Sequence, residues 1–305
     1  MKSYSILCIF IILSFKLLSQ NYIPYYKLVN EAEFKVYNKQ YKEALSLINN
    51  AFKLEEPLAK DYFLKAICLD KLITIKHTQK KIAECLKNAA LRNGRPIYWI
   101  SKNPLDIKID TNLIFELKAI EANQNLKTKA NYSDIEYFLA NDQRYRKIFT
   151  DSIMVYFNKE DIEYINYSKF VEKQDSINQT EFLDYIKQYN YPGIRKTGTN
   201  LSSTILIHLN CIFLDEYKHT LSEQLKKGYI HPFYYAQMVD RISCLCNNES
   251  SYYTYTIGKS VEKKCLNIDK NQIIKNRLSI GLSPYFKHSG ILRIAINQQK
   301  LISYP

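Results

Sequence analysis

Glycine is almost absent from the first two thirds of this chain. Of the seven glycines among 305 residues, only Gly94 precedes residue 190. Glycine weakens helix interiors, whereas tight turns need its conformational freedom. We therefore expect a mainly α fold, in which long helices dominate the first two thirds and the last third is divided into shorter helices and turns.

The N-terminus has the three parts of a cleavable signal peptide. A basic start at Lys2 precedes an apolar run from Ile6 to Leu13, and the segment closes with Ser19 and Gln20. Lys16 interrupts the apolar stretch before it reaches the roughly 20 residues that a membrane-spanning helix needs, so a retained single-pass anchor is the weaker alternative. No later segment is long and apolar enough to span. We expect residues 1–20 to be removed from a protein exported to the periplasm, the cell surface or the medium.

The chain is strongly basic, and its positive charge is unevenly distributed. The formal net charge is +13, and residues 251–305 hold nine lysines or arginines against Glu262 and Asp269. Such a C-terminal region can attract an anionic ligand. The alternative is an ordinary solvated surface without a dedicated partner. Export of the chain argues against nucleic acid as that partner.

Small residues within the region 22–125 recur at the spacing of a helical repeat. Ala32 and Ala66 lie 34 residues apart, and Ala44 and Ala51 fall in the helical pattern between them. This arrangement resembles the tetratricopeptide repeat, in which two helices pack closely at small residues. The resemblance implies stacked helix pairs with a concave groove for a peptide or protein partner. A generic helical bundle is the alternative.

A second, helical domain is expected over residues 130–305. The polar stretch 123–129 is the expected joint, because the hydrophobic periodicity changes after it. Ser251 to Ile257 is aromatic and β-branched almost throughout, which favours a strand. A return strand over 261–268 would complete a small β-hairpin near 251–268.

The cysteines suggest disulfides in an oxidising compartment. Removal of the signal peptide leaves six, an even number. The expected hairpin would bring its ends together, so we expect Cys265 to pair with Cys244 or Cys246. Cys68 and Cys85 fall within helical patterns, where buried free thiols are the simpler interpretation.

Five short motifs follow one another in the second half. They are Asp142-Gln143-x-x-Arg146, Tyr191-Pro192-Gly193 with Gly198, His208, Asp240-Arg241, and the stretch from Asn276 to Leu282. In this order they resemble a family of exported bacterial domains of unknown function, often found behind helical repeats, over residues 130–290. The resemblance implies a fold and no reaction. Family members tend to have Tyr-Gly-Thr-Gln after the Asp-Arg pair, where this chain has Tyr253-Thr254-Tyr255-Thr256 and lacks the glycine.

Polar residues in apolar surroundings mark a candidate site. His208 lies in an apolar stretch, and Asp240 and Arg241 follow one. Burying such groups is costly unless they satisfy one another or a ligand. We therefore expect them to meet in one pocket, although unrelated structural contacts are the alternative. The candidate catalytic residues are His208, Asp240 and Arg241, and the candidate binding residues, which share one helical face, are Asp142, Gln143 and Arg146.

Two functions are compatible with these patterns. The first is an exported interaction protein whose repeats bind a peptide or protein. The second is a hydrolase or a sugar- or anion-binding enzyme, because a histidine beside a carboxylate can move a proton and a guanidinium can bind an anionic group. The sequence has no complete phosphate-binding loop, serine-hydrolase elbow or zinc-protease motif, and nothing in it indicates a cofactor or a metal.

Overall fold

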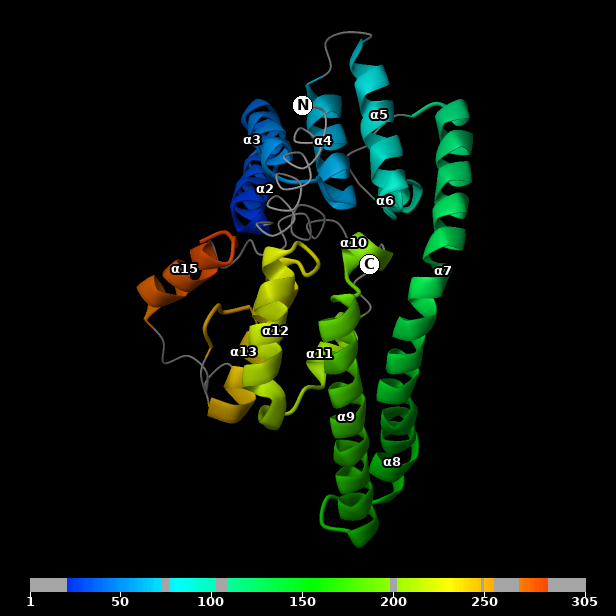
Figure 1. Cartoon of the computed structure of the whole chain (residues 1–305), viewed down its shortest axis with the longest axis vertical. Coiled ribbons are helices and arrows are strands. Elements are labelled where there is room, and N and C mark those ends of the chain that lie inside the picture. The colour runs from blue at the N-terminus through cyan, green and yellow to red at the C-terminus, as the bar shows by residue number, and fades with distance from the viewer. Residues whose placement is uncertain are drawn as a thin grey trace, which may run out of the picture.

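The computed structural model describes residues 21–72, 77–102, 109–197, 202–247, 250–254 and 269–284. Within these ranges the chain is helical and contains no strand (Figure 1), which confirms the mainly α fold class. Across the same ranges, no helix combines the length and the apolar character needed to cross a membrane.

Two successive helix pairs form the N-terminal part. α2 (Tyr22–Tyr37) packs against α3 (Tyr41–Leu54), and α4 (Ala59–Lys71) packs against α5 (His77–Leu91). The alanines that suggested a repeat lie where these helices approach one another, because all four are fully buried. Small side chains at such positions permit close helix contact. The four buried alanines are Ala32, Ala44, Ala51 and Ala66.

The polar stretch 123–129, expected as the joint between two domains, is helical. After the short α6 (Pro96–Lys102), α7 runs without interruption from Thr111 to Ile148 and crosses the polar stretch 123–129. The physical reason is that α7 contains neither glycine nor proline, and Asn, Gln and Lys cost a helix interior less than 1 kcal/mol each, an order-of-magnitude figure. The helix contacts α5 in the first part and α9 in the second, so it connects the two parts.

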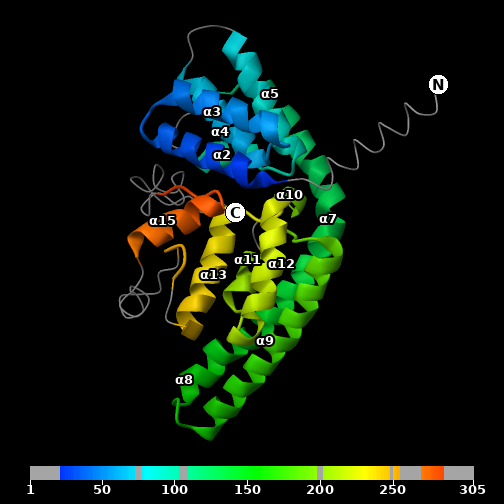
Figure 2. The ribbon, with the colours of Figure 1, turned by 60° about the vertical axis from the view of Figure 1, so that its left-hand side comes forward.

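The second part begins with a long helical hairpin. α7 turns through the π-helix η1 (Phe149–Ile153) and α8 (Met154–Tyr156) into α9 (Ile162–Tyr189). The turn at α8 lies at the end of the molecule opposite to α2–α5 (Figures 1 and 2). The remaining elements are α10 (Ile194–Thr197), α11 (Ser203–Ile207), η2 (Cys211–Phe213), α12 (Leu214–Lys226), α13 (Pro232–Asn247) and α15 (Lys270–Ser279). Among them, α12 packs against α9 and α13 packs against α12, while α15 lies on the side of α13 away from α9 (Figure 1).

The second part covers a face of α2. The Tyr26 hydroxyl donates to the carbonyl of Ile230 at 3.3 Å, and the Asn30 amide donates to the carbonyl of Gly281 at 2.5 Å. Gly228, with φ of +77°, lies so close to the Tyr22 ring that an added Cβ would come within 2.7 Å of it. This face of α2 is therefore an internal interface, and a partner that binds the repeats has to use another surface.

The expected β-hairpin is not supported. Ser251 to Thr254 form bends, and residues 255–268 lie outside the described part of the chain. The backbone N–H groups of Ser251, Tyr252 and Thr254 donate to the buried carboxylate of Asp240. Because a side chain takes these donors, they are not available to a neighbouring strand.

One disulfide connects Cys211 at the start of η2 to Cys246 near the end of α13, with the two Cα atoms 5.8 Å apart. The alternative that pairs Cys265 with Cys246 is therefore wrong, because the end of α13 lies beside η2. Cys244 is also disulfide-bonded, while Cys265 lies outside the described residues, so a Cys244–Cys265 pair stays a prediction. Cys68 and Cys85 are buried free thiols, as expected.

Candidate functional site

A histidine and a buried carboxylate form the centre of the site. His208 directly follows α11, and its Nδ1 lies 2.9 Å and 2.8 Å from the two carboxylate oxygens of Asp142 on α7. A carboxylate oxygen can only accept here, so Nδ1 carries the proton. The Asp142 side chain is 2% exposed and the His208 side chain 20%. Nε2 is therefore the ring nitrogen left for a ligand.

The helix that carries Asp142 also supplies an amide and a guanidinium. The Gln143 side-chain amide donates to Oδ2 of Asp142 at 2.5 Å. Arg146, one turn along α7, places its Nε 3.9 Å from Oδ1 of Asp142 and donates through its terminal nitrogen to Asp175 on α9. This i, i+4 spacing puts both side chains on one face of α7, as the sequence predicted.

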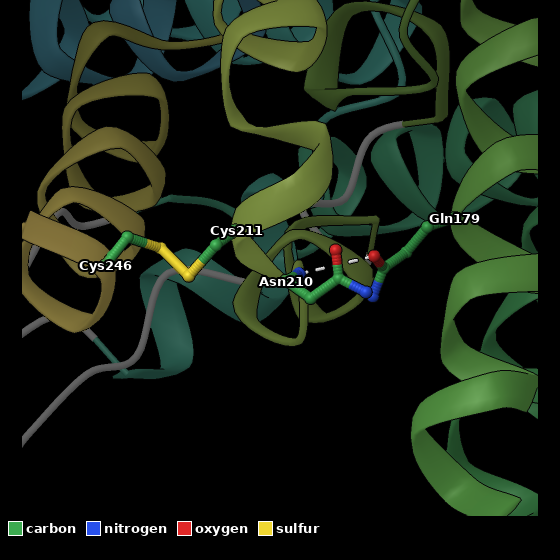
Figure 3. Close-up of a disulfide and its surroundings, with 4 residues drawn as sticks. All are labelled: Gln179, Asn210, Cys211 and Cys246. Carbon is green, nitrogen blue, oxygen red and sulfur yellow. Dashed lines mark hydrogen bonds between the residues drawn. A yellow bond between two sulfur atoms is a disulfide. The ribbon is translucent and has the colours of Figure 1, made fainter. Parts of the chain in front are cut away.

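A buried glutamine fixes the chain segment that carries His208. The Gln179 side-chain amide donates to the carbonyl of His208 at 2.7 Å, and its oxygen accepts from the N–H of Asn210 at 3.3 Å. Gln179 is 1% exposed. The next residue after Asn210 is Cys211, whose disulfide to Cys246 fastens the segment to α13 on the other side (Figure 3). The backbone at His208 is therefore held from α9 and α13, while Asp142 orients the ring.

These groups border an open pocket of about 450 Å³. Two of the lining residues are cationic side chains and one is the ring of Phe149 from the π-helix η1, an element that is often found at functional sites. The two cationic side chains favour a ligand with a negative group. The lining residues are Gln143, Arg146, Lys147, Phe149, Thr150 and His208.

The second carboxylate of the group has a perturbed acidity. Burial raises the pKa of Asp175 to about 6, against the lowering effect of Arg146, and the charge of Asp142 raises it further. Two carboxylates thus share one guanidinium in a partly buried site. Like charges so placed favour a proton on one of them.

Asp240 does not join this group. It is fully buried, and its two oxygens accept the three backbone N–H groups of residues 251, 252 and 254 and the hydroxyl of Thr254, at 2.6–2.8 Å. Arg241 lines a separate cavity of about 10 Å³ beside α11. The expectation that all six candidates share one pocket is therefore wrong for Asp240, whose hydrogen-bonding capacity is used by a neighbouring loop, and for Arg241, which lines the other cavity.

Other residues of the family-like motifs also hold this loop. Arg277 is fully buried and donates to the carbonyls of Ser283 and Tyr252 at 2.7 Å and 2.8 Å. The Asn276 amide donates to the carbonyl of Ser251 at 3.0 Å. Asp240 takes the loop's donors while Arg277 and Asn276 take its acceptors, so these residues act as a structural clamp.

Sequence reasoning missed Asp175 and Gln179. Both lie on α9 within the stripe that otherwise buries Val171, Phe182 and Ile186. Polar residues in the middle of an apolar helical stripe are a recognisable signal, because such a stripe faces the protein interior. Gln179 follows Asp175 by four residues, a spacing that places both side chains on one face of α9.

No family model matches this chain, and no curated protein or solved structure matches it either. Membership in the exported family whose motifs it resembles therefore remains a prediction. The function has to be argued from the geometry of the site.

Proposed function

We propose that this chain is an exported binding protein whose second part takes an anionic ligand into the pocket beside Asp142 and His208. The observation that carries the proposal is the position of His208, which is oriented by a buried carboxylate in the wall of a pocket that also presents Arg146 and Lys147. Charge-assisted hydrogen bonds from such donors are about twice as strong as neutral ones.

The same arrangement equips the pocket for acid–base chemistry. A carboxylate bonded to Nδ1 fixes the imidazole tautomer, and Nε2 can then exchange a proton with a group that lies against it. Asp142 is the positioning residue and His208 the proton carrier. Arg146 and Lys147 would hold the negative group of the ligand beside them.

Neutralising a pocket cation is expected to weaken anion binding. With sulfate as the probe, Arg146→Gln should raise the dissociation constant about tenfold, because a charge-assisted contact is lost. Lys147 is exposed and has no buried partner among the described residues, so Lys147→Gln should raise the dissociation constant several-fold. Calorimetric titration of the purified protein measures both.

Arg144→Gln is the matched control, since Arg144 lies on the same helix, is exposed and does not line the pocket. It should change the dissociation constant less than about twofold, because exposed charges are screened by salt. Equal effects of Arg144→Gln, Arg146→Gln and Lys147→Gln would contradict a specific pocket.

The proposed removal of residues 1–20 would leave the start of α2 intact. The Asn21 side chain caps α2 by accepting from the N–H of Ile23, and its own N–H donates to Glu55 at 3.2 Å. Tyr22 is fully buried. A mature chain that begins at residue 20 or 21 keeps the cap, whose loss typically costs about 1 kcal/mol. Intact-mass analysis of the exported protein should find this start, and full-length chain in the membrane fraction would contradict it.

A protein or peptide partner is the second candidate. The face of α2 is occupied, but the turn between α7 and α9 exposes large apolar side chains. Surfaces of this kind often mark contact sites. Cross-linking from this turn in the native envelope tests it. The exposed side chains, 40–77% accessible, are Ile148, Met154, Val155, Tyr156, Ile162 and Phe170.

A further inference from the structure

Arg146 serves both the pocket and an internal ion pair. It lines the pocket beside His208, and its guanidinium is bonded to the carboxylate of Asp175. The Asp175 side chain is 12% exposed and that of Arg146 is 26% exposed. An anion that enters the pocket therefore meets a guanidinium whose charge is already partly neutralised by the protein.

The charged groups around Asp175 come from two elements. Arg146 and Asp142 face it from α7, and His208 faces it from the end of α11. The Asp142 carboxylate is bonded to His208 and Gln143. Its Oδ1 lies 3.9 Å from Nε of Arg146, so Asp142 acts on the guanidinium only at longer range. Asp175 is thus the principal internal competitor for the charge of Arg146.

We propose that Asp175 gates the pocket, holding Arg146 while ionised and releasing its charge to a bound anion when protonated, so that anionic ligands bind more tightly in mildly acidic solution. The inference rests on the proposed function of this pocket and adds its regulation. A protonated carboxylic acid still accepts a hydrogen bond from Arg146, so the guanidinium keeps its position and only the charge balance changes.

The direction follows from electrostatics. Two negative charges about 5 Å apart repel each other at an effective dielectric constant near 20. Removing the charge of Asp175 should therefore raise the affinity for an anion at that distance more than about tenfold, before screening by salt. Burial raises the pKa of Asp175 to about 6, so the carboxyl changes its charge in mildly acidic solution. His208 also borders the pocket, so separate variants of Asp175 and His208 are needed to assign the pH dependence.

Sulfate binding at about pH 5 and about pH 7.5 tests the gate, because sulfate keeps its charge throughout this range. Wild-type protein should bind sulfate roughly tenfold more tightly at the lower pH. Asp175→Asn, which preserves the shape and the hydrogen-bond acceptor, should bind at the higher pH about as tightly as wild type does at the lower one. His208→Gln should retain most of the pH dependence.

Glu172→Gln is the control for charge alone, since Glu172 is exposed on the same helix one turn earlier. It should leave the wild-type profile unchanged. Asp175→Asn with the full wild-type pH dependence, or with weaker binding at both values, overturns the gate while leaving the pocket intact. Absence of sulfate binding in wild-type protein at both values, or binding that is insensitive to Arg146→Gln, overturns the proposed function itself.

Discussion

Replacing Lys60 by methionine is expected to destabilise the protein by about 3 to 5 kcal/mol, because it leaves buried charges without their partner. Lys60 is buried at the start of α4, with its Nζ 3.5 Å from Glu33 and 3.7 Å from Asp61. It also lies 2.8 Å from Nε2 of His231, which comes from the second part of the chain. This lysine therefore connects the two helix pairs to the second part.

The pKa values of the groups around Lys60 give the direction in which this destabilisation changes with pH. Burial raises the pKa of Glu33 and of Asp61, and burial and then Lys60 lower the pKa of His231, which stays neutral. In Lys60→Met both carboxylates lose their cation, so their folded pKa values rise further above the unfolded ones. Such groups contribute stability at low pH that is lost as pH rises. The destabilisation should thus be smaller near pH 5 than near pH 7.5.

Urea denaturation at both pH values measures this effect. Lys42→Met is the control, since Lys42 is exposed on α3, and it should change the free energy of unfolding by less than about 0.5 kcal/mol. Adding Glu33→Gln to Lys60→Met should recover part of the loss, because one uncompensated charge disappears. A loss below about 1 kcal/mol for Lys60→Met would contradict the role given to this network.

Asp240→Ala is expected to cost about 3 to 5 kcal/mol, because three backbone N–H groups and a hydroxyl lose their acceptor in a buried place. Asp240→Asn retains one acceptor oxygen and should cost less. Since Asp240 has its own partners away from the pocket, the folded Asp240→Asn variant should bind sulfate as wild type does.

Thermal and urea unfolding compare these variants with Asp184→Ala, an exposed aspartate on α9. The control should stay within about 0.5 kcal/mol of wild type. Loss of sulfate binding in folded Asp240→Asn would show that Asp240 belongs to the pocket after all, and an unchanged stability of Asp240→Ala would contradict the clamp.

Some of this architecture could be predicted from the sequence. The scarcity of glycine before residue 190 indicated long helices, and the spacing of Ala32 and Ala66 indicated close helix pairs. Asp142, Gln143 and Arg146 could be placed on one face because helix geometry is local. The contact of His208 with these residues was inferred from the cost of burying a polar group. That cost does not say which residue is the partner, so the fold was needed to test the inference.

Other features depend on contacts that the sequence does not show. The aromatic and β-branched run after Ser250 reads as a strand, yet Asp240 and Arg277 bind its backbone in a bent form. Local propensity cannot anticipate a distant carboxylate that satisfies backbone donors. Likewise, the polar composition of the stretch 123–129 suggested a break between helices, yet it contains neither glycine nor proline and continues α7.

The orientation of the His208 ring tests the central claim most directly. Nitrogen-15 correlation spectra of the five histidines, with His208 assigned through His208→Gln, report which ring nitrogen carries the proton. At neutral pH the account predicts a proton on Nδ1 of His208, and a sulfate titration that moves its Nε2 resonance in wild-type protein and much less in Arg146→Gln. A proton on Nε2, or a His208 signal unmoved by sulfate while sulfate binding is measured, would contradict it.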